Sequence, residues 1–198
     1  MKVLLLGKNG MLGSEFLRLL SNRDGVELTA TDRDGFDITD EAALTDFVDK
    51  TAPEVVINCA AYTFVDNCEE NKELAFKVNA EAPKNIAKLC KKHGAYLIHF
   101  STDYVFDGGK KEYFENDETN PLSVYGQSKL EGEKNIAAEC DKYYIFRIST
   151  LFGVHGGNFV QKIYEAAKSK DEIEVVDDYV SCPTYAADLA ERIVNDFI

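Results

Sequence analysis

A tyrosine and a lysine in the stretch SVYGQSKLEGE have the residue types and the spacing for proton chemistry. Tyr125 and Lys129 are four residues apart, about one helical turn, so on a helix both side chains emerge from the same face. An ammonium near a phenol favours the phenolate and lowers the tyrosine pKa from its ordinary value of about 10. Such a pair can exchange a proton with a carbonyl or an alcohol near neutral pH.

Spacing alone does not identify the pair, because Tyr164 and Lys168 repeat it in YEAAK. Context separates the two. Polar side chains in the stretch Ser101 to Tyr104 precede Tyr125, and Asn120-Pro121 predicts a turn directly before its helix. The second pair has no hydroxyl partner upstream in register, and we interpret it as a solvent-exposed helix face.

Short apolar runs predict the strands that must position these residues. They are Val3 to Leu6, Val26 to Ala30, Val55 to Cys59, Ala95 to Phe100 and Tyr144 to Ile148. Helical patterns fall between them, and those of Glu69 to Ala80 and Pro83 to His93 are compatible with one helix bent near Pro83. The alternation predicts an α/β fold: a Rossmann-like doubly wound parallel sheet with helices on both faces. Ligands of such sheets bind at the carboxyl ends of the strands, where Ser101 to Tyr104 would lie.

A glycine turn, GKNGMLG, follows the first predicted strand directly. Gly7 permits a tight turn, Gly10 lets a pyrophosphate approach the backbone, and Gly13 lets helix and strand pack closely. The helix N-terminus adds free N–H groups and a positive potential. GxxGxxG is a weak signal by itself, and the strand and helix around it favour dinucleotide binding over a purely structural turn.

Charged residues after the second predicted strand bear on the choice of cofactor. An acid about 20 residues beyond the glycines commonly binds the adenosine ribose, and Asp32 stands near that place. Asp32 suits NAD, whereas Arg33 or Lys8 suits the 2′-phosphate of NADP. The sequence therefore leaves the preference open.

Two further stretches are expected to border the cofactor. Asp37 and Ile38 would flank the adenine, although ITDEAAL also reads as a helix start capped by Asp40 or Thr39. Cys59 ends the third predicted strand and Ala60 to Tyr62 follow it, where small side chains let a cofactor lie close above the sheet.

Composition narrows the class of protein. The chain has 198 residues, enough for one large domain with a sizeable core. Its net charge of −13 disfavours nonspecific binding to nucleic acid or to an anionic membrane surface. Five scattered cysteines without a CxxC pair indicate reduced thiols in a cytoplasmic protein. The histidines show no metal-like spacing, with His99 expected as a packed strand residue, and the apolar run before Gly7 is too short for a signal peptide or membrane span.

Six motifs in order carry a resemblance to a known family. They are GxxGxxG, NCAAYTFVD, FSTDYVFDG, NPLSVYGQSKLEGE, RISTLFG and SCPTYAADLA. Together they resemble the dTDP-4-dehydrorhamnose reductase family of the extended short-chain dehydrogenase/reductase superfamily, from Lys2 to about Ala190. Each motif is moderately specific, and six in order are highly specific.

The resemblance implies an NADP- or NAD-dependent oxidoreductase of dTDP-rhamnose and cell-surface polysaccharide synthesis. Its substrate would be a nucleotide-linked 4-keto-6-deoxy sugar, reduced at the C4 keto group. Tyr125 would donate the proton to the developing alkoxide, Thr102 would orient the same oxygen, and Lys129 would lower the tyrosine pKa and bind the nicotinamide ribose. Asn79 falls on the family's VN motif beneath the site, and no metal ligand is implied.

Pattern and resemblance together give the expected binding residues. Those for the cofactor are Gly7, Asn9, Gly10, Met11, Leu12, Asp32, Asp37, Ile38, Cys59, Ala60, Ala61, Tyr62, Ser101, Tyr125 and Lys129. Those for the substrate are Tyr62, Val65, Asp66, Thr102, Asp103 and Tyr104. For Tyr62 and Tyr104 the competing interpretation is a core aromatic, and for Asn79 it is a satisfied buried amide.

The chain is expected to form one NAD(P)-binding domain over residues 1–198, with about 150–198 contributing the start of a substrate-binding region. Members of the family continue for a further subdomain, so that region is expected to be incomplete. Substrate affinity and turnover would suffer, and exposed apolar surface would favour self-association as a homodimer.

Two other functions fit parts of the pattern. An epimerase or dehydratase of nucleotide sugars needs extra acid/base groups near the sugar, and FSTDYVFDG points away from it. A non-catalytic NAD(P)-binding regulatory subunit, resembling that of methionine adenosyltransferase, would act through a protein partner. The intact Thr102, Tyr125 and Lys129 favour an enzyme, whereas an incomplete substrate region favours the subunit.

Overall fold

The core of the protein is a parallel sheet of five strands in the order β2-β1-β3-β4-β5. The computed structural model describes residues 1–178 and 180–198. The strands span Lys2–Leu6 (β1), Glu27–Thr31 (β2), Val55–Asn58 (β3), Tyr96–Thr102 (β4) and Tyr143–Ile148 (β5). The strand order changes direction between β1 and β3, which places a ligand crevice at their carboxyl ends. The predicted fold class is confirmed.

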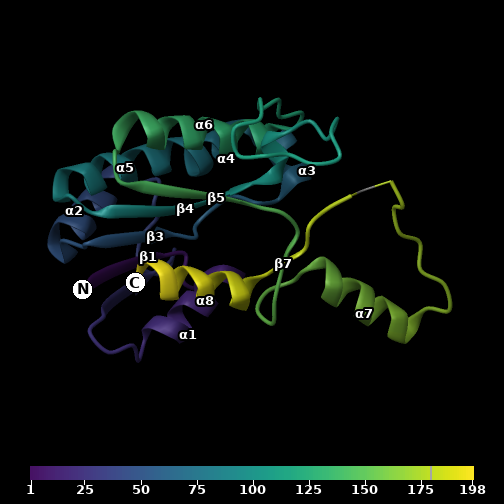
Figure 1. The fold of residues 1–198 in the computed structure, drawn as a ribbon, viewed down its shortest axis with the longest axis horizontal. Coiled ribbons are helices and arrows are strands. Elements are labelled where there is room, and N and C mark those ends of the chain that lie inside the picture. The colour runs from purple at the N-terminus through teal and green to yellow at the C-terminus, as the bar shows by residue number, and fades with distance from the viewer. Residues whose placement is uncertain (179) are drawn as a thin grey trace.

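Helices cover both faces of the sheet (Figure 1). On one face lie α1 (Met11–Leu20) and α8 (Ala186–Phe197), and on the other lie α2 (Glu41–Thr51), α5 (Ala82–His93) and α6 (Val124–Glu139). Strand side chains alternate between two core clusters: Val3 packs in the cluster of α1 and α8, and Leu4 packs in the cluster of α5 and α6. Burial on both faces explains why the strands read as continuous apolar runs.

The segment between β3 and α5 differs from its prediction. A short helix, α3 (Val65–Glu70), precedes α4 (Lys72–Phe76), and a π-helical turn, η1 (Lys77–Glu81), continues directly into α5. Asn71 interrupts the expected helix with a non-helical backbone. Pro83 lies in the first turn of α5, where its missing N–H is tolerated, so one continuous but irregular helix passes through it.

After β5 the chain forms a second, two-stranded sheet and a helix before α8 packs against the main sheet. Strand β6 (Leu151–Phe152) pairs in parallel with β7 (Thr184–Tyr185), and α7 (Phe159–Ser169) projects away from the body between them (Figure 1). No residue of α7 is buried. The Lys168 ammonium lies 4.1 Å from the ring centre of Tyr164, which is 61% exposed, so this pair is a solvent-exposed face as predicted. Within the described residues, no helix combines the length and the apolar character that spanning a membrane requires.

Candidate active site

The glycine turn places the N-terminus of α1 at the carboxyl end of β1. Gly7 adopts a φ of +81°, and a Cβ there would lie 2.7 Å from the Ala60 nitrogen. A Cβ on Gly13 would lie 1.9 Å from the Gly7 carbonyl oxygen, so both positions require glycine. A Cβ on Gly10 would instead lie at an ordinary contact distance of 3.5 Å from the Gly7 carbonyl oxygen, and as N-cap Gly10 offers no side chain to the first-turn N–H groups of α1. Those groups are therefore available to an anionic ligand.

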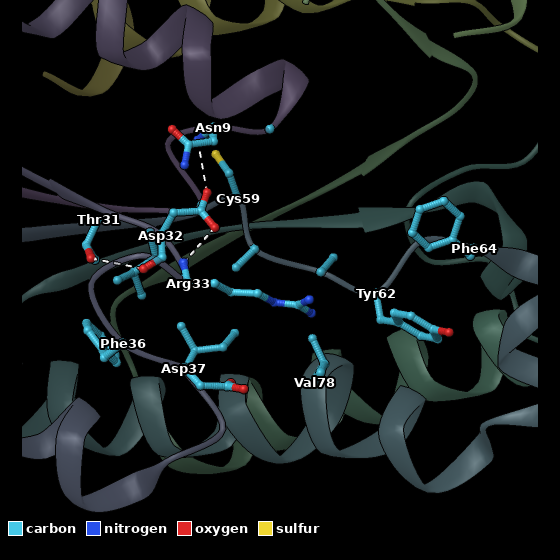
Figure 2. Close-up of a pocket in the computed structure, with 16 residues that line it drawn as sticks. Asn9, Thr31, Asp32, Arg33, Phe36, Asp37, Cys59, Tyr62, Phe64 and Val78 are labelled. Carbon is cyan, nitrogen blue, oxygen red and sulfur yellow. Dashed lines mark hydrogen bonds between the residues drawn. The ribbon is translucent and has the colours of Figure 1, made fainter. Parts of the chain in front are cut away.

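A cavity of about 370 Å³ opens above this turn, between the carboxyl ends of β1, β2 and β3 (Figure 2). Among its lining residues are ten that the sequence predicted for the cofactor: Gly7, Asn9, Gly10, Asp32, Asp37, Ile38, Cys59, Ala60, Ala61 and Tyr62. Residues without that prediction also line it: Leu6, Thr31, Phe36, Phe64 and Val78. Phe36 directly precedes the predicted Asp37, and this adjacency is the one feature of the sequence that indicates its place in the cavity lining.

Hydrogen bonds tie the end of β2 to the glycine turn. The Asp32 carboxylate accepts from the backbone N–H of Asn9 at 3.0 Å and from that of Arg33 at 2.7 Å. The Arg33 side chain extends across the cavity (Figure 2), whereas the Lys8 ammonium pairs with Asp34 at 3.4 Å. Arg33 is thus the better placed of the two cations to meet a ligand in the cavity.

Asp37 and Asp40 have separate roles. Asp40 caps α2 by accepting from the Ala43 N–H at 3.0 Å, which confirms the predicted helix start. Asp37 lines the cavity, and the N–H of Thr39 donates to it at 2.9 Å. That hydrogen bond lowers the pKa of the Asp37 carboxyl, which is therefore ionised near neutral pH.

Asn79, in the π-helical turn, joins the cavity loop to α6. Its Oδ1 accepts from the Tyr62 N–H at 2.8 Å, and its Nδ2 donates to the Tyr62 carbonyl at 2.9 Å and to Ser128 Oγ at 3.0 Å. Ser128 Oγ in turn donates to the Tyr125 carbonyl at 2.8 Å. The amide is buried and fully bonded, so Asn79 holds the loop in a fixed relation to the helix of Tyr125.

Tyr125 stands in the first turn of α6, close to the end of β4. Ser123 caps this helix through the N–H of Gly126 at 3.1 Å. The Tyr125 phenol lies beside Thr102, and its ring packs edge-on against that of Tyr104 with the centres 5.7 Å apart. Burial raises the pKa of Tyr125 to about 12, outweighing the lowering by Thr102.

Lys129 lies one turn further and points to a different partner. Its Nζ donates to the Phe100 carbonyl at 2.6 Å and lies 3.4 Å from His99 Nε2. Burial lowers the pKa of Lys129 to about 8. The expectation that Lys129 lowers the pKa of Tyr125 is therefore wrong for this arrangement, because the ammonium is directed at the strand and burial of the phenol dominates.

The remaining predicted residues lie around the cavity rather than in its lining. Leu12 packs in the core with Met11 against it, and Val65 and Asp66 begin α3. Asp103 accepts hydrogen bonds from Thr102 and Ser149. Ser101 is buried, and its Oγ is the buried side-chain atom that lacks a hydrogen-bond partner in the part of the chain described.

Cys59 and Arg147 differ in how they relate to the cavity: Cys59 lines it, and Arg147 does not. Burial raises the pKa of Cys59, so its thiol stays protonated. Arg147 forms a two-pronged ion pair with the buried Glu133, at 2.6 Å for the shortest contact, and also donates to the Glu115 carbonyl. Arg147 therefore braces α6 and the loop after β4 instead of lining the cavity.

Comparison with protein families gives one match over nearly the whole chain. The family described as "RmlD substrate binding domain" matches residues 1–196. Among curated proteins, the dTDP-4-dehydrorhamnose reductase of Streptomyces griseus is 44% identical over 192 residues. That alignment covers 96% of this chain but 63% of the relative, so the chain spans less than two thirds of that protein's length.

Solved structures give the same picture. The dTDP-4-dehydrorhamnose reductase of Clostridium acetobutylicum superposes with a TM-score of 0.94 at 46% identity, covering 98% of this chain and 69% of that one. The enzyme of the same name from Bacillus anthracis, in complex with NADP, superposes with a TM-score of 0.94 at 37% identity over the same shares of the two chains. A UDP-glucose 4-epimerase from Thermus thermophilus in complex with NAD, at 21% identity, has a TM-score of 0.83 and is similar in fold alone.

Proposed function

The chain belongs to the RmlD substrate binding domain family, alongside the dTDP-4-dehydrorhamnose reductases. We propose that it acts as an NAD(P)H-dependent reductase of a nucleotide-linked 4-keto-6-deoxy sugar. The reduced group would be the C4 keto group, and dTDP-4-dehydrorhamnose is the type substrate. The observation that carries the proposal is the juxtaposition of the Thr102 and Tyr125 side chains next to Tyr62, which lines the cavity. Tyr62 connects the two places, since it lines the cavity and packs in the same cluster as Tyr125.

The cavity suits a dinucleotide on the evidence of its own residues. Gly10, which lines the cavity without a side chain, and the uncapped first turn of α1 would hold the pyrophosphate. Asp32 and Arg33 would meet the adenosine ribose. A bound nicotinamide cofactor would supply the hydride.

The hydroxyl pair would handle the proton. Tyr125 keeps its proton over the whole physiological range, because its pKa is raised to about 12, so it is set to act as a donor. Thr102 neighbours the phenol and would hold the same substrate oxygen. Without substrate, the single proton of the Thr102 hydroxyl is directed at Asp103, 3.2 Å away, and it would turn to the substrate oxygen on binding.

The test is an assay of NADPH and NADH oxidation with dTDP-4-keto-6-deoxy-L-mannose made in situ. We expect turnover by the protein and a loss of about 10²–10⁴-fold in Tyr125→Phe, with cofactor binding by fluorescence unchanged. Tyr164→Phe is the matched control, since its ring lies on the exposed face of α7. Turnover that persists in Tyr125→Phe would refute the assignment, and cofactor binding without any turnover would favour a non-catalytic subunit.

A further inference from the structure

His99 occupies the centre of the sheet and contacts the proposed catalytic lysine. In β4 it pairs in register with Asn58 of β3 and with Ile145 of β5. Its side chain is fully buried, whereas the side chains of His93 and His155 are 20% and 48% exposed. Its Nδ1 faces the side-chain amide of Asn58, and its Nε2 faces the Nζ of Lys129. A residue that only filled space in the core would need neither polar neighbour.

The neighbours of His99 determine where its proton lies. Asn58 Oδ1 accepts from the Ala60 N–H at 3.1 Å, so the amide nitrogen of Asn58 is the atom that faces His99 Nδ1, at 3.2 Å. An amide nitrogen can only donate, and His99 Nδ1 must therefore accept. Burial, and next the charge of Lys129, hold the pKa of His99 well below its ordinary value. The neutral ring carries its single proton on Nε2, facing Lys129.

The surroundings of Lys129 then favour one protonation state. A Nε2–H and an ammonium are both donors, so at 3.4 Å they oppose each other, whereas an amine can accept from Nε2–H and still donate to the Phe100 carbonyl. Glu133 on the same helix favours the ammonium, and Cys59, with a raised pKa, stays neutral. Burial is the largest cause of the lowered pKa of Lys129, and the donor–donor geometry at His99 acts in the same direction.

We propose that His99 is a positioning residue for Lys129. The tautomer of the His99 imidazole, set by Asn58, holds the lysine nitrogen at the Phe100 carbonyl and favours the unprotonated form of the lysine. The importance of this for catalysis rests on the proposed function, whereas the tautomer and the titration of Lys129 do not. Together with burial, His99 would thereby lower the pH at which the lysine loses its charge.

The tautomer is tested first, on the protein without substrate. In a long-range ¹H–¹⁵N spectrum across pH 5.5–9.5, His99 is assigned by the signals lost in His99→Gln, with His93 and His155 as internal references. We expect the Nε2–H pattern at every pH and no titration. A Nδ1–H pattern, or a midpoint near the ordinary pKa of about 6.5, would overturn the proposal.

The lysine is tested next, by ¹³C and ¹⁵N labelling of lysine side chains. Lys129 is expected to titrate near pH 8, and in His99→Gln, whose amide oxygen can accept from the ammonium, about one pH unit higher. Asn58→Asp should act in the same sense, because its carboxylate draws the imidazole proton to Nδ1. His93→Gln is the matched control and should leave Lys129 unchanged. An unshifted Lys129 in a folded His99→Gln would refute the proposal, whereas expected shifts without sugar turnover would count against the proposed function alone.

Discussion

Tyr125 and Lys129 have pKa values shifted in opposite directions by the same cause, burial. The phenol at about 12 stays protonated, and the lysine at about 8 loses its charge within a pH unit or so of neutrality. We therefore expect kcat/KM for reduction to be flat from pH 6 to 7.5 and to fall above about pH 8, because the cationic lysine disappears before the phenol ionises. A pH–rate profile measures this. A fall in kcat/KM near pH 7 that is caused by loss of the phenol proton would contradict the raised pKa of Tyr125.

Arg33 is the residue from which a cofactor preference is predicted. Its guanidinium reaches across the cavity, while Lys8 is engaged by Asp34. A guanidinium–phosphate contact contributes about 1.5–3 kcal/mol, so Arg33→Ala should lower kcat/KM for NADPH by about tenfold to a hundredfold and that for NADH by less than about twofold. Lys8→Ala is the matched control, with a smaller change expected. Equal losses with both cofactors would contradict a role at the 2′-phosphate.

At the scale of elements, what the sequence reveals depends on whether a pattern is local. The strands and glycine turn are readable because burial on both faces produces apolar runs and because Gly7 and Gly13 admit no side chain. The π-helical turn that orients Asn79 is set by tertiary contact with α6 and leaves no periodic signal. The direction of the Lys129 side chain was likewise not predictable. Its spacing from Tyr125 is local, but the Phe100 carbonyl that accepts its hydrogen bond belongs to another element.

Gly132 lets α6 approach the π-helical turn. A Cβ at this position would lie 2.2 Å from the Asn79 carbonyl oxygen, which is backbone and cannot move aside easily. Gly132→Ala should gain about 1 kcal/mol of helix propensity and lose more to overpacking, for a net destabilisation of about 1–3 kcal/mol with a raised KM for the cofactor. Urea unfolding and cofactor titration measure the two effects. Gly157→Ala is the control, because no heavy atom lies within 4 Å of its added Cβ, and it should be neutral or slightly stabilising.

The whole molecule divides energetically into a packed sheet domain and a projecting helix. Phe16 of α1 is fully buried against the sheet, and Ile193 of α8 lies in the same cluster. Phe159 and Tyr164 of α7 are 55% and 61% exposed. We therefore expect the sheet with its covering helices to supply most of the stability, and we predict that the exposed apolar side chains of α7 mediate self-association.

We expect replacement of an aromatic side chain by alanine to reduce stability strongly in the sheet domain and weakly in α7. Phe16→Ala should lower the free energy of unfolding by about 3–5 kcal/mol, because it leaves a cavity in the core. The double change Phe159→Ala with Tyr164→Ala should lower it by less than about 0.5 kcal/mol in dilute solution, because it removes surface that is already exposed. Urea unfolding at several protein concentrations, with size-exclusion chromatography of the same samples, measures both stability and association. If α7 mediates self-association, the double variant should lose the dependence of elution on concentration, and a large loss of stability in dilute solution would instead mean that α7 is packed within the monomer.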